Sequence, residues 1–385
     1  MTGLNKIVEP DVFVVADNIL SPLGKTTAEN FSNLKQNISG VKLHRSAEIS
    51  SQPFYASLFN GDENFLKNNA HKYTKFEQLL IASVNDALLD SGINVADKKT
   101  VLIISSTKGN IRLLETGENN DALKKRIALP TSAKLVSEYF GFTTRPVIVS
   151  NACISGVLAI ITGMRLLRSG QCENAVITGA DVISKFILSG FESFQALSPQ
   201  ICKPFDSLRD GLNLGEGAGT IILSTNKKYR QNIKVKGGSV SNDANHISGP
   251  SRTGEELAYA IKKAMEDADV LAGDIDLISA HGTATVYNDE MEANAFALSA
   301  LQSVPINSLK AYYGHTLGAA GLIESIVSVQ SMKEGLVLPT LGFEDMGVTK
   351  HLNICTGLLA GNFKNCLKTA SGFGGCNAAV VFGIG

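Results

Sequence analysis

Short apolar runs rich in β-branched residues alternate along the chain with longer segments in which apolar residues recur at helical spacing. The pattern predicts strands at residues 12–16, 101–104, 147–149, 220–223, 234–240, 276–279, 366–369 and 379–382. Helices are predicted at residues 26–38, 76–89, 132–140, 153–170, 254–268 and 315–333, with a polar, irregular segment at 39–72. This alternation is typical of an α/β protein whose buried sheets are covered by helices.

The second half of the chain resembles the first in its order of elements. Residues 147–149 and 276–279 hold comparable positions in the two halves, and each strand runs into a loop that carries reactive side chains. Neither a linker nor a low-complexity tract separates the halves. We therefore expect two similar halves, residues 1–228 and 229–385, that pack tightly across one shared core.

Composition narrows the classes of protein that are possible. A 44% hydrophobic fraction with only 18% charged residues excludes a disordered chain. The net charge of -1 provides no overall field for a nucleic-acid backbone, so no nucleic-acid partner is expected. The longest apolar runs are far shorter than the roughly 20 residues of a membrane helix, and Asp17 interrupts the apolar stretch near the amino terminus. We therefore expect a cytoplasmic protein without a membrane segment.

The six cysteines are scattered and form no C-x-x-C pair. This spacing predicts reduced thiols and no metal site. Two glycine-rich segments also fail as nucleotide-binding motifs. The segment Ser21–Thr26 has Ile19 where a phosphate-binding loop needs glycine, and Gly215–Gly219 is followed by a predicted strand where a dinucleotide fingerprint needs a helix.

Cys153 is the strongest candidate for a nucleophile. It follows the predicted strand 147–149 and begins a helical segment that is apolar on nearly every side. Unpaired N–H groups and the helix dipole at such a position favour a thiolate and lower the thiol pKa. The same amides could hold an oxyanion during attack on a thioester. The alternative interpretation is a buried structural cysteine.

Two histidines lie beside glycines at the ends of predicted elements. His281 directly follows the strand 276–279, where α/β folds commonly place active sites, and His315 lies at the predicted start of the helix 315–333. The neighbouring glycines allow close approach of the backbone and therefore a tightly packed site. Taken alone, a histidine in such a position is more often a core residue whose hydrogen bonds are satisfied than a catalyst.

Together these segments resemble the β-ketoacyl-acyl-carrier-protein synthases, the elongating condensing enzymes of the thiolase superfamily. The resemblance covers most of the chain and rests on five blocks in the family's order: Asn151–Gly156, Lys203–Gly219, His281–Asp289, Lys310–Glu324 and Ser371–Asn377. It implies a thiolase-like fold, in which two similar halves form a layered α-β-α-β-α sandwich. The first half would carry the nucleophile and the second both histidines.

The resemblance also implies a role for each matching residue. Cys153 would take the acyl group from a thioester, and His281 and His315 would bind the malonyl thioester carbonyl and assist decarboxylation. Two neutral imidazoles suit this work because each can donate a hydrogen bond to a developing oxyanion. Lys310 would orient His315, with Glu324 as its charge partner, since a buried lysine without a partner is costly.

Further residues of the matching blocks would shape the rest of the site. Phe373 would act as a gate, with its amide joining that of Cys153 in the oxyanion hole. Thr283 and Thr285 would hydrogen-bond the phosphopantetheine arm, although turn-forming hydroxyls are the plainer interpretation of both. The block Pro204–Gly219 is interpreted as structural. Two residues depart from the family's pattern. Ala284 replaces the usual glycine or serine, and Cys376 stands where threonine or histidine is common; both changes are small.

The implied partner is an acyl carrier protein, and no further cofactor is expected. Because such carriers are acidic, the predicted docking candidates are the basic residues Lys67, Lys72, Lys75, Lys124, Lys125 and Arg126, for which a solvated charged face is the alternative. The resemblance further implies a dimer, either of two copies or with a catalytically silent relative. The pathway stays open between fatty-acid and polyketide synthesis, aryl polyenes included.

Two other functions remain as alternatives. A noncatalytic chain-length or scaffold partner on the same fold should lack the nucleophile, which argues against it here. A degradative thiolase should use a second cysteine as a base, and Cys376 lies near the loop where that cysteine is expected. The paired histidines and Lys310 favour malonyl decarboxylation over thiolysis.

Overall fold

The main sheet has ten strands, five from each half of the chain. The computed structural model describes residues 9–61, 63–66, 68, 70–89, 91–245 and 249–385. The first half contributes β1 (Phe13–Leu20), β4 (Thr100–Ser105), β5 (Val147–Val149), β6 (Asn174–Asp181) and β8 (Gly217–Ser224). The second half contributes β9 (Ile233–Asn242), β10 (Leu277–Ser279), β11 (Ile306–Asn307), β14 (Asn365–Gly372) and β15 (Cys376–Ile384).

The two sets of five strands share one topology. Their orders are β1-β8-β6-β4-β5 and β9-β15-β14-β10-β11. In each set the first three strands are antiparallel neighbours and the last three are parallel neighbours. A single pairing, Phe13 with Lys234, joins β1 to β9 and makes the sheet continuous. The repeat that the order of elements predicted is therefore present in the strand connections.

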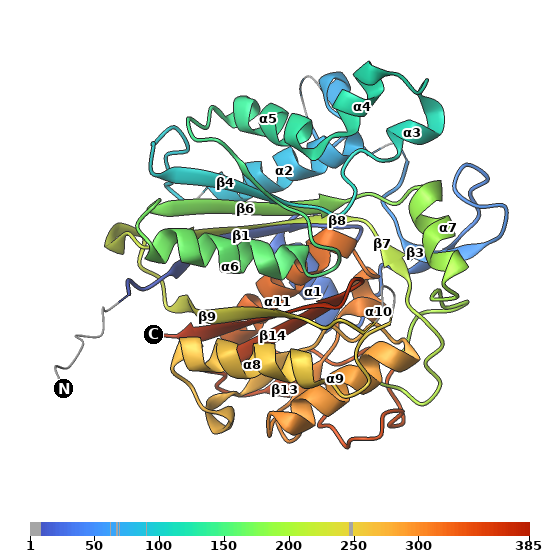
Figure 1. The fold of residues 1–385 in the computed structure, drawn as a ribbon, viewed down its shortest axis with the longest axis vertical. Coiled ribbons are helices and arrows are strands. Elements are labelled where there is room, and N and C mark those ends of the chain that lie inside the picture. The colour runs from blue at the N-terminus through green and yellow to red at the C-terminus, as the bar shows by residue number, and fades with distance from the viewer. Residues whose placement is uncertain (1–8, 62, 67, 69, 90, 246–248) are drawn as a thin grey trace.

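Helices cover the sheet in layers that Figure 1 shows from top to bottom. One outer layer holds α2 (Lys75–Leu89) and α5 (Leu129–Phe140), and the other holds α8 (Glu255–Ala268) and α9 (Val286–Leu298). Between the two halves of the sheet lie α1 (Thr27–Lys35), α6 (Ser155–Arg168) and α11 (Ala320–Glu334). Nearly every residue of α11 is buried, as expected of a helix enclosed on all sides. The result is the expected α-β-α-β-α sandwich.

Smaller elements surround this frame. A three-stranded sheet contains β2 (Lys42–His44), β3 (Phe54–Ser57) and β7 (Leu214–Gly215), and a two-stranded sheet contains β12 (Leu336–Val337) and β13 (Leu359–Ala360). The short helices are α3 (Leu113–Thr116), α4 (Asp121–Ile127), α7 (Lys185–Ser193) and α10 (Lys310–Tyr313), with 3-10 turns at Ala70–Lys72, Lys227–Tyr229, Ala272–Asp274 and Leu317–Ala319. Among the described residues, none of the helices has the length and apolar character needed to cross a bilayer.

Two sequence-based element predictions need correction. The segment 39–72 is not wholly irregular, because it contains β2 and β3. The predicted helix 315–333 begins only at Ala320, so His315 lies in a break between α10 and the next 3-10 turn. Gly314 makes this break possible, because its φ of +66° suits glycine and a Cβ there would lie 2.4 Å from the Leu214 carbonyl oxygen.

Close packing of α6 against α11 fixes the position of the chain just after Cys153. A Cβ on Gly156 would lie 2.5 Å from the backbone nitrogen of Leu322 on α11. We expect Gly156→Ala to lower the free energy of unfolding by about 1–3 kcal/mol, because the two helices must separate. Thermal or urea unfolding measures the change. Gly190→Ala is the matched control, since a Cβ there meets nothing within 4 Å inside helix α7 and should be neutral or slightly stabilising. Equal stability of the two variants would contradict the proposed helix contact.

Candidate active site

Cys153 lies in a tight turn between β5 and α6. Ala152 holds a left-handed conformation with a φ of +43°, which is uncommon for a residue with a side chain. The Ser155 hydroxyl stabilises the turn by accepting from the Asn151 amide at 2.8 Å and donating to the Ala152 carbonyl oxygen at 2.7 Å. Cys153 therefore precedes the first residue of α6 by two positions, and its side chain lines a cavity of about 450 Å³.

His281 follows β10, and charged side chains hold its backbone. The Glu292 carboxylate accepts from the amides of His281 at 2.8 Å and Gly282 at 2.6 Å. The Lys310 ammonium donates to the His281 carbonyl oxygen at 2.8 Å and lies 3.5 Å from Nδ1 of the ring. Because an ammonium group can only donate, Nδ1 is the accepting nitrogen and the proton of the neutral ring is on Nε2.

His315 is held by the block that the sequence predicted to be structural. Its amide donates to the Asn213 carbonyl oxygen at 2.6 Å, and its own carbonyl accepts from Gly215 at 3.1 Å. The ring is almost fully buried, and Nδ1 has no hydrogen-bond partner in the described part of the chain. The block 204–219 thus places a histidine, and its residues Asp210, Gly211 and Leu212 also line the cavity.

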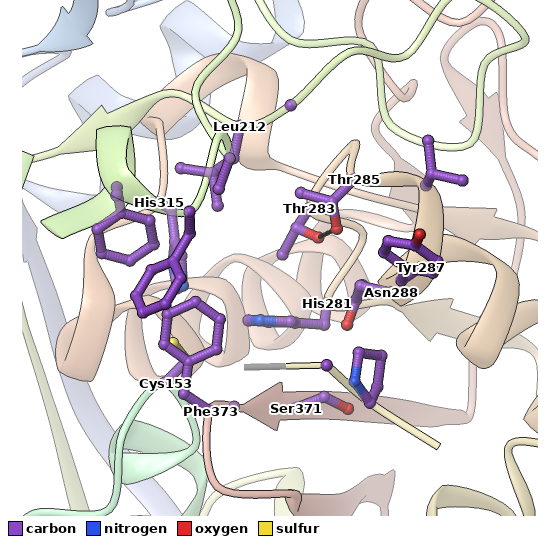
Figure 2. A pocket seen from close by; sticks show the side chains of 18 of the residues that line it. Cys153, Leu212, His281, Thr283, Thr285, Tyr287, Asn288, His315, Ser371 and Phe373 are labelled. Atoms are coloured by element: carbon purple, nitrogen blue, oxygen red, sulfur yellow. Dashed lines mark hydrogen bonds between the residues drawn. The ribbon is translucent and has the colours of Figure 1, made fainter. Parts of the chain in front are cut away.

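The cysteine and the two histidines converge on one end of the cavity, as Figure 2 shows. One ligand atom from each of Cys153, His281 and His315 lies within 4.8 Å of the other two. The two imidazole rings meet edge to face with their centroids 5.2 Å apart. Residues far apart in the sequence, from both halves of the chain, are therefore close enough to act on one small group of reacting atoms.

Burial sets the protonation states of these three side chains. It lowers the pKa values of His281 and His315 well below the usual range, and the Lys310 ammonium lowers them further, so both rings are neutral as expected. Burial also raises the pKa of the Cys153 thiol to about 12, despite the opposing effects of Lys310 and the Phe373 amide. The sequence-based expectation of a lowered thiol pKa is therefore wrong for the resting protein. A thiol with a raised pKa needs a base to take its proton before the sulfur can act as a nucleophile, and one nitrogen of each imidazole lies within 4.8 Å of the sulfur.

Lys310 and Glu324 form the expected buried ion pair, but Lys310 contacts a different histidine from the one predicted. Its ammonium bonds to Glu324 Oε1 and to His281, so the expectation that it orients His315 is wrong. A second buried lysine, Lys368, lies 2.8 Å from Glu324 Oε2. Sequence reasoning missed Lys368, although a lysine inside the apolar run of β14 is a usable signal of a special environment.

Phe373 lies beside Cys153 and lines the cavity (Figure 2). Its backbone amide donates toward the cysteine sulfur, in the position expected of an oxyanion-hole donor. Its ring is 37% exposed and packs against Phe191, with centroids 5.7 Å apart, and Phe194, with centroids 5.3 Å apart. The sequence analysis missed these two phenylalanines, which have no motif of their own.

Thr283 and Thr285 lie farther along the same cavity, near Tyr287 and Asn288 (Figure 2). Their hydroxyl groups are 2.9 Å apart and hydrogen-bond to each other. Ala284, between them, has a φ of +60°, in the region that favours glycine. This strained turn directs both hydroxyls into the cavity, where they can bind a polar arm of a substrate.

Two of the six predicted docking residues form ion pairs with buried carboxylates of the same chain. Arg126 forms a two-pronged ion pair with the fully buried Glu77, and Lys75 lies 2.6 Å from the buried Glu216. Both side chains are half-buried, so part of each basic group is already neutralised by a carboxylate, and their role in docking stays a prediction. Lys67 lies outside the described residues. The remaining candidates, Lys72, Lys124 and Lys125, are exposed.

The sulfur and two imidazoles are also spaced closely enough to bind a soft metal ion. The ammonium groups of Lys310 and Lys368 lower the pKa of both histidines, and the same positive charge disfavours adding a cation between them. Cys376 does not supply a further ligand for such a metal ion. It is not among the described residues that line the cavity, and its sulfur faces the Phe373 carbonyl oxygen at 3.5 Å.

Comparison with known proteins identifies the family. The β-ketoacyl synthase N-terminal domain matches residues 9–228 and the C-terminal domain matches residues 233–344. The chain is 30% identical over 408 residues to 3-oxoacyl-[acyl-carrier-protein] synthase 2 of Vibrio cholerae, covering 96% of this chain and 98% of that protein. Its fold matches the ishigamide ketosynthase/chain length factor with a TM-score of 0.89 at 23% identity, over 98% of this chain and 100% of that one.

A ketosynthase of Xenorhabdus doucetiae, solved in complex with its chain length factor, matches with a TM-score of 0.85 at 24% identity over the full length of both chains. The sequence-based expectation of a thiolase-like sandwich is confirmed by these matches and by the strand order. The family matches also cover every block on which the resemblance was based except Ser371–Asn377. The chain therefore belongs to the β-ketoacyl synthase family of acyltransferases.

Proposed function

We propose that this chain is a 3-oxoacyl-acyl-carrier-protein synthase that extends an acyl chain by decarboxylative Claisen condensation, in fatty-acid or polyketide synthesis. The observation that carries the proposal is the meeting of one thiol and two neutral imidazoles in a single buried cavity. A nucleophile is needed to hold the growing chain, and hydrogen-bond donors without charge are needed to stabilise an enolate.

The first half-reaction loads the acyl chain on Cys153. The sulfur attacks the carbonyl carbon of an acyl thioester, and the amides of Cys153 and Phe373 stabilise the oxyanion. The bond to the carrier's phosphopantetheine sulfur then breaks. The proton lost by Cys153 passes through an imidazole to the departing carrier thiolate, which leaves as a free thiol.

The second half-reaction forms the carbon–carbon bond. His281 and His315 donate to the thioester carbonyl oxygen of the malonyl group, which allows the bond to its carboxylate to break with release of carbon dioxide. The enolate carbon attacks the acyl carbonyl on Cys153, and the carbon–sulfur bond to the enzyme breaks. The product leaves as a 3-oxoacyl group on the carrier, and Cys153 takes up a proton.

The rest of the cavity supports delivery of both substrates. Thr283 and Thr285 are proposed to hydrogen-bond the phosphopantetheine arm, since both residues line the cavity near His281 (Figure 2). The Phe373 ring is proposed to gate the acyl chain, because it is partly exposed, lines the cavity, and packs against two other rings that line it, Phe191 and Phe194. No resident metal or organic cofactor takes part in the proposed reaction.

An acyl carrier protein is the proposed partner, as the name of the Vibrio cholerae relative suggests. Lys72, Lys124 and Lys125 are the exposed basic residues proposed to meet it. We also propose a dimer, with a second copy or with a chain length factor such as the one bound to the Xenorhabdus ketosynthase. β5 ends the main sheet and is paired on one side only, so it leaves an edge for such a partner.

The division into halves at residues 228 and 229 is proposed from the repeated strand order and from the separate ranges of the two family matches. A cytoplasmic location is proposed because all six cysteines are free thiols, as in a reducing compartment.

The decisive experiment supplies malonyl-carrier protein without an acyl primer and measures carbon dioxide. We expect release well above the rate of spontaneous decarboxylation, because enolate stabilisation needs only the two histidines. A parallel sample with acyl-carrier protein should gain the acyl mass on the intact protein. Thiolysis of a 3-oxoacyl thioester by coenzyme A without carbon dioxide release would instead establish a degradative thiolase. A protein that neither acylates nor releases carbon dioxide would be a scaffold partner.

A further inference from the structure

Lys368 is a fully buried lysine directly behind the catalytic pair. It lies on β14, opposite Ser279 in the parallel pairing with β10. β10 ends at Ser279, two residues before His281, so the Lys368 side chain meets the backbone that carries this histidine. A buried ammonium group is costly unless oxygen atoms surround it, and its partners therefore indicate what it does.

Three oxygen atoms surround the Lys368 ammonium. It donates to the carbonyl oxygens of Ser279 at 3.1 Å and Ala280 at 3.0 Å. It also lies 2.8 Å from Glu324 Oε2, an ion pair rather than a well-directed hydrogen bond, because Oε2 has no partner of hydrogen-bonding geometry. Glu324 is thus shared by two ammonium groups, with Lys310 on its other oxygen.

The backbone around His281 is consequently held at three successive points. Lys368 binds the carbonyl of Ala280, Glu292 binds the amide of His281, and Lys310 binds the carbonyl of His281. The hydroxyl of Thr369, the residue after Lys368, donates to the same Glu292 carboxylate at 3.0 Å. Removing any one of these contacts would loosen a loop whose imidazole must point accurately at the substrate carbonyl.

We propose that Lys368 is a positioning residue for His281, and that its ammonium group also acts as a fixed buried cation behind both imidazoles. This inference rests on the proposed function and deepens it. The cation strengthens each imidazole as a hydrogen-bond donor toward the enolate oxygen, because its field favours negative charge on the far side of the ring. Lys368 itself does not touch the substrate, since it is not among the residues that line the cavity.

The charge of Lys368 also affects the pH dependence of the reaction. Together with burial and Lys310, it lowers the pKa of both histidines. The titratable groups around the two rings are Lys310 on α10, Lys368 on β14 and Cys153 before α6, with Glu292 on α9 bound to the His281 amide, Glu324 on α11 bound to both lysines, and each imidazole beside the other. Loss of one positive charge makes a ring easier to protonate and raises its pKa. The proposed reaction needs neutral rings. On acidification, a variant without the charge would therefore lose activity at a higher pH than the wild type.

The test compares Lys368→Gln and Lys368→Met with the wild type in unprimed malonyl decarboxylation between pH 4.5 and 8. Glutamine keeps a donor for the two carbonyls but removes the charge, whereas methionine removes both. We expect the turnover rate to fall about 10-fold for Lys368→Gln and about 100-fold for Lys368→Met, with KM changed less than about threefold. The acid limb of both profiles should move to higher pH than in the wild type. Lys236→Gln on β9, outside the site, is the matched control and should behave as wild type.

Chemical rescue separates the two roles of Lys368, because added ammonium would not restore the rate if the role of Lys368 were purely structural. In Lys368→Ala, added ammonium chloride should restore part of the rate, while tetramethylammonium chloride of equal ionic strength should not, because it is too large and cannot donate. A Lys368→Gln variant that keeps the wild-type rate and pH profile would overturn the inference. So would rate losses that only track the loss of folded protein in circular dichroism, with no rescue by ammonium. Absence of carbon dioxide release by the wild type would instead overturn the proposed function.

Discussion

Replacing Cys153 by alanine is expected to abolish condensation, with a loss of about 10⁴-fold or more. The acyl chain must be held covalently while the malonyl group is decarboxylated, and Cys153 offers the sulfur that faces both imidazoles in the cavity. The change removes one atom from a small buried side chain and leaves the turn contacts of Ser155 intact, so the fold should persist. Malonyl decarboxylation should persist too, because His281 and His315 are unaltered.

Intact-mass measurement after incubation with acyl-carrier protein checks this expectation. The wild type should gain the mass of the acyl group and Cys153→Ala should gain none. Cys376→Ala is the matched control, since Cys376 is a buried cysteine near the same loop that does not line the cavity. This control should acylate normally. A covalent acyl adduct on Cys153→Ala, or its loss from Cys376→Ala, would show that the nucleophile has been misassigned.

The sequence was informative about the site because three of its side chains lie at the ends of locally recognisable elements. Cys153 follows a short apolar strand, and His281 follows the corresponding strand of the second half. The local patterns placed these side chains in comparable loops of the two halves, and the family resemblance implied that they act in one site. The break around His315 was not predicted, because it depends on contact between Gly314 and the distant β7 segment.

The electrostatic details depend on contacts that no local pattern contains. Lys310 was expected to serve His315, but folding brings its ammonium to the His281 carbonyl instead. Lys368 went unnoticed because its partners Ser279 and Ala280 are about 90 residues away and meet it only through the β10–β14 pairing. The direction of the Cys153 pKa shift was misjudged for a similar reason. The helix start is visible in the sequence, whereas the depth of burial that opposes it is not.

His315→Ala is expected to reduce malonyl decarboxylation about 10²- to 10³-fold, the usual cost of removing one oxyanion donor, while acyl transfer to Cys153 falls by less than about tenfold. The difference arises because the two steps use different donors. In the proposed reaction, the amides of Cys153 and Phe373 stabilise the oxyanion of acyl transfer, and the imidazoles stabilise the malonyl enolate. Parallel measurement of carbon dioxide release and acyl-enzyme mass separates the two effects.

Two further variants make this expectation specific to the hydrogen bond rather than to packing. His315→Asn keeps an N–H donor that cannot titrate, and it should retain more decarboxylation than His315→Ala. His351→Ala, a change at an exposed histidine, should leave both steps unaltered. Loss of acyl transfer with decarboxylation untouched would reverse the assigned roles. Equal loss of both steps in the alanine and asparagine variants would mean that His315 acts mainly as the base for the Cys153 thiol, whose raised pKa makes such a base necessary.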